Sequence, residues 1–166
     1  MIIGAQLVLV TQNQFNHLLK LSYRTIVDAN DVTTNNMQDK YRRKITSVTL
    51  IRYHFVWIPA RRKKVLVGGV SERLKQLLTD KCIELNCSIV TMEIMPDHVH
   101  LLVDAPPNLA PDQIMFRLKG FTSFQLRKEY PHLKKIPSLW TRSYFCGTVG
   151  NASEETVKKY IENQNT

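Results

Sequence analysis

Long hydrophobic runs, paired cysteines and an excess of acidic residues are all missing from this chain of 166 residues. No apolar run reaches the roughly 18 residues that a membrane-spanning helix needs. The chain has three cysteines, Cys82, Cys87 and Cys146. They form no CxxC motif, and any disulfide would leave one thiol unpaired. Free thiols of this kind are typical of a reducing compartment. The sequence therefore argues against a membrane-spanning helix and against a disulfide-rich secreted scaffold.

The beginning of the chain lacks the marks of a secretory signal. The opening MIIGAQLVLV has no basic segment ahead of its apolar residues and no small-residue cleavage site, so we expect a cytoplasmic protein. Residues 1–36 carry two basic and two acidic residues, so the net positive charge lies in the rest of the chain. We expect residues 1–36 to be an extension, either an added helix or a translated leader upstream of the natural start. Residues 37–166 are expected to form one domain.

Basic residues outnumber acidic ones by 23 to 14, which gives a formal charge of +9. A charge of this size attracts polyanions, with nucleic acid the commonest partner and an anionic membrane the rival. Aromatic residues lie near the basic clusters, and phosphate contacts combined with stacking suit an unpaired strand. Each cluster taken singly is more often a solvated surface. The clusters are 40–44, 61–64, 127–128, 134–135 and 158–159.

Hydrophobic periodicity predicts one α+β domain. Runs rich in β-branched and aromatic residues indicate strands, and apolar residues at helical spacing indicate helices. The expected order is βαββαβ with one more helix at the end. It matches a ferredoxin-like or RRM-like antiparallel sheet that carries two helices on one face and leaves the other face free. The expected strands are 45–58, 87–95, 98–103 and 143–149, and the expected helices are 71–85, 111–129 and 153–163.

Two histidines alternate in the segment MPDHVHLLV. Side chains two apart on a strand point to the same side, so His98 and His100 converge while Val99 points into the opposite layer. Imidazole nitrogens are good ligands for divalent metals. The alternative is a pair of polar residues on an open sheet face, and the spacing alone does not decide between the two.

A tyrosine and an amide share one face of the last expected helix. Tyr160 and Gln164 are four residues apart, so their side chains stack on one side and could approach a common centre. A phenol is a poor nucleophile unless a cation lowers its pKa or polarises its target. The alternative is an amphipathic surface helix whose tyrosine ring packs on the sheet.

Several blocks in this order resemble the HUH single-tyrosine transposases of small prokaryotic insertion sequences, the IS200-like family. The resemblance runs from about Tyr41 to Gln164 and leaves residues 1–36 outside it. The blocks are YHFVWIPARRKKVL, MPDHVHLLV, LKGFTSFQLRKEYP, LWTRSYFCGTVG and SEETVKKYIENQ.

The resemblance implies a function and a site. His98 and His100 match the two histidines of the HUH motif, Gln164 matches the residue that completes the metal site, and Tyr160 matches the nucleophile. Mg²⁺ or Mn²⁺ would be the cofactor, without a nucleotide cofactor or ATP. The expected reaction cuts and rejoins single-stranded DNA through a 5′-phosphotyrosine bond.

The resemblance also implies partners. Members of the family are homodimers with a joined sheet, and the tyrosine helix of one subunit can serve the histidines of the other. They bind DNA hairpins at the ends of the element, which would place the protein at the nucleoid when DNA is bound. We expect shape and phosphate recognition to dominate. The candidate DNA contacts are Arg52, Arg61, Arg62, Lys63, Lys64 and Lys119, with Lys119 near the active site.

Three other functions remain open at this point. An RNA-binding domain of the same topology would also be basic and aromatic, but it would not need the paired histidines. A histidine phosphoesterase usually has a third alternating histidine or a second HxH or HxT pair. The third position here is Leu102, and the sequence contains no second pair. A domesticated transposase would bind hairpins without cutting them.

Overall fold

A computed structural model describes residues 41–150 and 154–163 of the chain. The expected extension over residues 1–36 lies outside the described residues, as do 151–153 and 164–166. The described elements are the strands β1 (Arg42–Lys44), β2 (Ser47–Thr49), β3 (Arg52–Trp57), β4 (Ser88–Met95), β5 (His98–Asp104) and β6 (Phe145–Thr148), the helices α2 (Gly69–Glu84), α3 (Pro111–Glu129) and α4 (Glu154–Glu162), and the short 3-10 turns η1 (Ala60–Arg62) and η2 (Pro131–Lys135).

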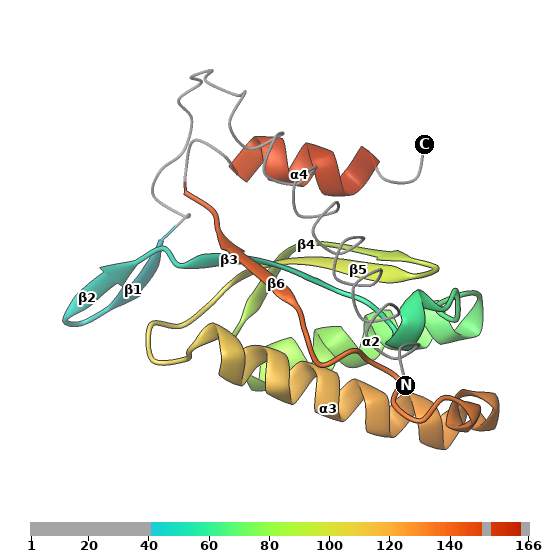
Figure 1. Cartoon of the computed structure of the whole chain (residues 1–166). Coiled ribbons are helices and arrows are strands. Elements are labelled where there is room, and N and C mark those ends of the chain that lie inside the picture. The colour runs from blue at the N-terminus through green and yellow to red at the C-terminus, as the bar shows by residue number, and fades with distance from the viewer. Residues whose placement is uncertain (1–40, 151–153, 164–166) are drawn as a thin grey trace, which may run out of the picture.

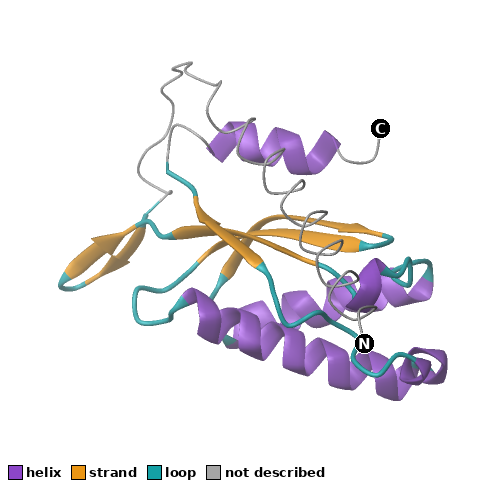
Figure 2. Ribbon diagram, in the orientation of Figure 1, coloured by secondary structure: helices purple, strands orange, loops and turns teal. Residues whose placement is uncertain are grey.

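A four-stranded antiparallel sheet in the order β4-β5-β3-β6 forms the middle layer (Figure 1). β5 and β3 are the two central strands, and Val56 of β3 lies opposite His100 of β5. α2 and α3 lie side by side against one face of this sheet (Figure 2). The predicted ferredoxin-like α+β fold is therefore confirmed.

The second face of the sheet carries α4, which Figure 1 shows on the side opposite α2 and α3. We expected this face to be free, and in that respect the structure differs from the expectation. Val157 and Ile161 of α4 pack with Leu102 of β5 and Val149 in one small buried cluster. An apolar patch on the second face thus holds the last helix in place.

The first predicted strand, over residues 45–58, is two strands in the structure. β2 forms a hairpin with β1 that stands apart from the main sheet, and β3 enters the sheet at Arg52. Arg42 of the hairpin forms an ion pair with Asp104 at the end of β5. β-branched residues favour extended backbone without specifying the pairing partner, so composition alone did not show the break between 49 and 52.

The helices lie close to their predicted positions. α3 spans Pro111–Glu129, as expected, and ends before Pro131. α2 begins at Gly69 and not at Ser71, because Gly68 has a φ of +54°, a conformation that glycine adopts without strain. No helix among the described residues is both long and apolar enough to cross a membrane.

The main hydrophobic core lies between the sheet and the two helices α2 and α3. Val99, Leu101 and Val103 point into it from β5, whereas Leu102 points to the α4 side. The rings of Trp57 and Trp140 meet edge to face, with centroids 6.0 Å apart. Alternation along one strand therefore serves two separate layers.

The three cysteines are free thiols, as expected from the sequence. Cys82 and Cys87 are buried in the main core, and Cys146 is half-buried. Burial raises the pKa of the Cys82 thiol to about 12 and that of Cys146 to about 11. The protonated thiols behave as small hydrophobic groups.

Leu78, a fully buried side chain of α2, tests the importance of this core. We expect Leu78→Ala to lower the free energy of unfolding by about 2–5 kcal/mol, because it removes buried methyl groups and leaves a cavity. Ile83→Ala is the control on the same helix, since Ile83 is 68% exposed. Urea unfolding should show a change within about 0.5 kcal/mol for the control. Equal losses in both variants would contradict the described packing.

Candidate active site

His98 and His100 occupy one face of β5, on the side that carries α4. Their ring centroids are 5.0 Å apart, and the rings are nearly perpendicular. His98 is 7% exposed and His100 is 2% exposed. Val99 between them points into the main core, as alternation along a strand predicts. The structure therefore brings the two histidines together in a largely buried position.

Asp97 holds the ring of His98. An Asp97 carboxylate oxygen lies 2.6 Å from Nδ1 of His98. Nε of Arg62 donates to the other carboxylate oxygen at 2.8 Å. Burial alone would raise the pKa of Asp97, but the bond from His98 and the charge of Arg62 lower it below its usual value. With Nδ1 engaged, a metal would bind His98 through Nε2, an arrangement common among metal-bound histidines.

The turn that carries Arg62 has an unusual backbone. Arg61 and Arg62 have φ values of 58° and 50°, in the left-handed region that non-glycine residues rarely adopt. This conformation costs roughly 1–2 kcal/mol per residue. Arg62 reaches Asp97 from this turn, and the N–H of Leu66, four residues later, donates to the Pro96 carbonyl at 3.0 Å. The strained backbone therefore lies in the turn whose contacts hold the segment before His98 in place.

His54, on β3, is a site residue that sequence reasoning missed. Its Nε2 lies 3.1 Å from Nδ1 of His100. Burial lowers the pKa of His54 to about 4, and burial together with the charges of His54 and His98 lowers the pKa of His100 to about 2. Burial therefore favours the neutral form of both rings. A single histidine in an apolar strand gave no indication of this contact, which depends on the pairing of β3 with β5.

Tyr160 lies over His100 on the α4 side of the sheet. The two ring centroids are 5.8 Å apart, and the rings meet at 84°. Val157 and Ile161 on the same helix are buried against Leu102, and the tyrosine ring lies over His100, two residues along β5 from that contact. The histidines and the tyrosine of the same chain therefore meet, although they are distant in sequence.

The side chains present fit a metal ion. Nε2 of His100 is buried and has no hydrogen-bond partner among the described residues. A buried ring nitrogen without a partner costs free energy, and a metal ion would satisfy an unprotonated one. The described residues contain no group of three or more histidine, cysteine or acidic side chains placed to hold a metal. Gln164, expected as the third ligand, lies outside the described residues.

Four of the predicted DNA contacts lie in the turn after β3. Arg61, Lys63 and Lys64 are exposed, whereas Arg62 is partly buried by its ion pair with Asp97. This ion pair places the turn beside His98. The three exposed cations are thus available to phosphates next to the histidine pair.

The other two predicted DNA contacts lie elsewhere. Arg52 is 9% exposed and faces Asp104, with 4.0 Å between Nε and a carboxylate oxygen. Lys119 was expected near the active site, but it lies on α3, which covers the opposite face of the sheet (Figure 1). Ile114, Met115 and Leu118 face the main core, and this orientation of α3 carries Lys119 away from the histidines.

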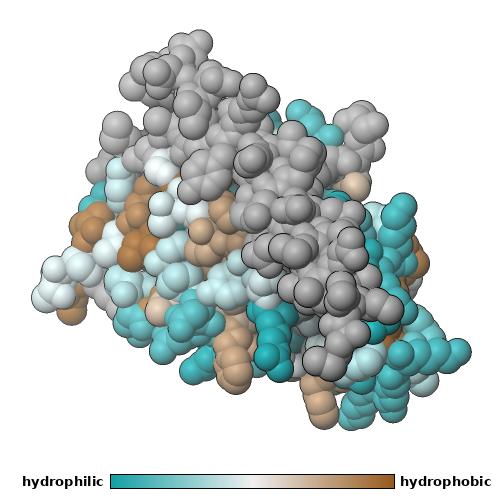
Figure 3. All heavy atoms as spheres, viewed as in Figure 1, coloured by the Kyte–Doolittle hydropathy of each residue, from teal (hydrophilic) through white to brown (hydrophobic). Residues whose placement is uncertain are grey.

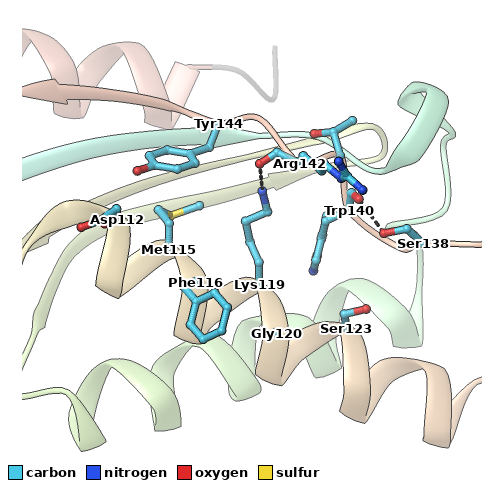
Figure 4. A pocket seen from close by; sticks show the side chains of 11 residues that line it. Asp112, Met115, Phe116, Lys119, Gly120, Ser123, Ser138, Trp140, Arg142 and Tyr144 are labelled. Carbon is cyan, nitrogen blue, oxygen red and sulfur yellow. Dashed lines mark hydrogen bonds between the residues drawn. The ribbon is translucent and has the colours of Figure 1, made fainter.

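Lys119 lies in a groove of about 370 Å³ between α3 and the segment before β6 (Figure 4). Its Nζ donates to the backbone carbonyls of Arg142 and Ser143, at 2.9 and 3.2 Å. Burial lowers the pKa of Lys119 to about 8. The side chain therefore joins α3 to the segment that leads into β6.

Comparison with known proteins identifies the family. Residues 47–164 match the family model described as "Transposase IS200 like". The ISDra2 transposase TnpA of Deinococcus radiodurans is 38% identical over 117 residues, which cover 69% of this chain and 84% of the relative. The transposase for insertion sequence element IS200 of Salmonella typhimurium is 29% identical over 116 residues, which cover 68% and 76%.

A solved structure agrees with these relatives. The crystal structure of a Deinococcus radiodurans protein described as a transposase superposes with a TM-score of 0.63 at 33% identity. The match covers 74% of this chain and 97% of the other. The fold, the site and the relatives lead to one conclusion: the chain belongs to the IS200-like transposase family.

Proposed function

We propose that this transposase cuts and rejoins single-stranded DNA through a covalent bond to Tyr160. The observation that carries the proposal is the contact of the Tyr160 ring with His100, 5.8 Å between centroids. A nucleophile beside a pair of metal-ligand side chains is the arrangement that phosphoryl transfer to a tyrosine needs. The family membership of the chain supports the same reaction.

The reaction balances without an external energy source. The Tyr160 hydroxyl oxygen attacks the scissile phosphorus, loses its proton and forms a phosphotyrosine bond. The bond from phosphorus to the 3′ oxygen breaks, and that oxygen takes up a proton to become a free 3′-OH. Rejoining reverses these steps with the 3′-OH of another strand, which releases Tyr160. Each step exchanges one phosphodiester for another, so no ATP is consumed.

The proposed cofactor is Mg²⁺ or Mn²⁺, held by His98, His100 and Gln164. Bound there, the ion would supply charge stabilisation for the scissile phosphate as negative charge builds up during the attack. The protein supplies two imidazole rings that are held in place by Asp97 and His54. Imidazole ligands favour Mn²⁺, whereas Mg²⁺ prefers oxygen ligands.

The proposed substrate is single-stranded DNA with hairpin ends. Exposed cations in the turn after β3 lie beside the histidine pair and suit phosphate contacts. A second basic surface lies at the C-terminal end of α3 and on η2. Figure 3 shows hydrophilic side chains gathered in this region. The second surface includes Arg127, Lys128 and Lys134. Phe124 on α3 is 68% exposed and lines the same groove as those cations, so it offers a stacking surface beside them.

The proposed assembly is a homodimer with a joined sheet. β4 is an edge strand of eight residues, and its side chains from Ile89 onward are all only partly buried. An exposed edge of this length can pair with a strand of another chain. In contrast, an RNA-binding domain that stacks bases on an open sheet face is disfavoured, because α4 covers that face.

Covalent capture of DNA tests the reaction. The protein is incubated with a single-stranded oligonucleotide that carries the hairpin end and cleavage site of its own element, with Mg²⁺ or Mn²⁺. We expect a protein–DNA adduct that survives denaturation, because Tyr160 holds the 5′ phosphate. A 3′-end label should stay with the protein, and a 5′-end label should appear on a shorter strand. Tyr160→Phe and His98→Ala should each abolish the adduct.

Tyr144→Phe is the matched control for the loss of one hydroxyl. Tyr144 lines the groove on the opposite face of the sheet, so this variant should form the adduct normally. An adduct that persists in Tyr160→Phe would refute the assignment of the nucleophile. Hairpin binding with no adduct in either metal would instead support a domesticated DNA-binding protein.

Metal affinity tests the support of His98 by Asp97. We expect Asp97→Ala to weaken Mn²⁺ binding by about 10- to 100-fold in calorimetry, since the ring loses the partner that orients Nε2 toward the metal. Asp97→Asn should lose less, because an amide oxygen can still accept from Nδ1. Asp80→Ala, an exposed carboxylate of α2, is the control for loss of negative charge. Unchanged affinity in Asp97→Ala would contradict this role.

Salt dependence tests the turn after β3. We expect the double variant Lys63→Ala and Lys64→Ala to weaken hairpin binding and to reduce the slope of log K against log salt by about 1 per lost contact. Mn²⁺ affinity should stay the same. Arg62→Ala should instead weaken Mn²⁺ binding and leave the salt slope unchanged, because Arg62 holds Asp97. Lys75→Ala, an exposed cation on α2, serves as the control, and an equal effect there would rule out a specific contact.

A further inference from the structure

His54 and His100 are joined by one hydrogen bond between ring nitrogens. The rings lie nearly parallel, at 18°, with centroids 5.3 Å apart. His54 is 1% exposed and His100 is 2% exposed, so water does not compete for this bond. The register of the sheet places His54 opposite Leu102, diagonal to His100 and on the same face. The contact is therefore a fixed feature of the two central strands.

The direction of this bond decides the chemistry of His100. In a neutral imidazole one nitrogen carries the proton and the other accepts. If Nδ1 of His100 donates to Nε2 of His54, then Nε2 of His100 has a lone pair and can bind a metal. If His54 donates instead, Nε2 of His100 carries the proton and cannot bind one. The two directions are mutually exclusive.

We propose that His54 is a positioning residue that accepts the Nδ1 proton of His100 and so presents Nε2 of His100 as a metal ligand. The inference rests on the proposed metal site. Nε2 of His100 is buried without a partner among the described residues, and it can bind a metal ion only in its unprotonated form, so the proposed site requires Nδ1 to be the donor. Nδ1 of His54, also buried without a partner there, then carries the proton.

In this arrangement both histidines are held through Nδ1 by a polar side chain. Asp97 engages Nδ1 of His98, and His54 engages Nδ1 of His100. Each ring is thus held from behind by a polar side chain, which fixes its tautomer and its orientation. A carboxylate supports the more exposed histidine, and a neutral ring supports the more buried one, where a second negative charge would be costly to desolvate.

Nitrogen NMR of the metal-free protein tests the direction of the bond. With ¹⁵N-labelled histidine, long-range proton–nitrogen spectra report which ring nitrogen is protonated, and His54→Phe assigns the signals. We expect His100 to carry its proton on Nδ1 in the wild-type protein. A proton on Nε2 of His100 would overturn the proposal, and this measurement needs neither metal nor activity.

Manganese affinity, measured by calorimetry, tests the consequence. We expect His54→Phe, which keeps an aromatic ring but removes the acceptor, to weaken Mn²⁺ binding by about 10- to 100-fold. His54→Gln keeps an acceptor close to Nε2 and should recover most of the affinity. Phe145→Leu is the packing control, because Phe145 meets the His54 ring edge to face at 6.0 Å without a hydrogen bond. It should bind Mn²⁺ like the wild type.

The outcomes separate this proposal from the proposed function. Normal Mn²⁺ binding in His54→Phe, with weakened binding in His98→Ala, would overturn the role of His54 alone. A wild-type protein that binds no Mn²⁺ would overturn the metal site and, with it, this inference. Circular dichroism checks that His54→Phe is folded. If it is not, His54→Gln and the wild-type tautomer still decide the question.

Discussion

The antiparallel pairing of β3 with β5 is the constraint on which the rest of the structure depends. It places Val56 opposite His100 and brings His54 within hydrogen-bond distance of that ring. The same register sends Val99 and Leu101 into the main core. A slip of one residue would turn every side chain of the strand to the other face. The packing of the core and the position of the histidines are therefore set by one arrangement.

The histidines and Tyr160 belong to parts of the fold that are packed to different extents. His98 and His100 project from a central strand between two neighbours, and their rings are fixed by Asp97 and His54. α4 is held to the sheet by a much smaller apolar cluster than the one that holds α2 and α3. The metal ligands thus belong to the most extensively packed part of the fold, and the nucleophile belongs to a helix with fewer buried contacts.

The basic residues serve different purposes in spite of their common charge. Arg52 and Arg62 are paired with acidic side chains, and Lys119 ties α3 to the segment before β6. Such residues contribute to the net charge of the chain but act mainly on its structure. Exposed cations with no such structural role, among them Lys63 and Lys64, remain available for phosphates. Tertiary structure, more than composition, therefore decides which charges face a nucleic acid.

The sequence by itself determined the order of elements from β3 to α4, the α+β class and the shared face of His98 and His100, because these follow from local periodicity and strand alternation. The family followed from motifs in a fixed order. The break between β2 and β3, the burial of Arg52 and the position of α4 were decided only by tertiary structure. The same holds for His54, whose role depends on a partner 46 residues away in the chain. Local patterns specify which way a side chain points, whereas strand pairing and helix packing specify what it meets.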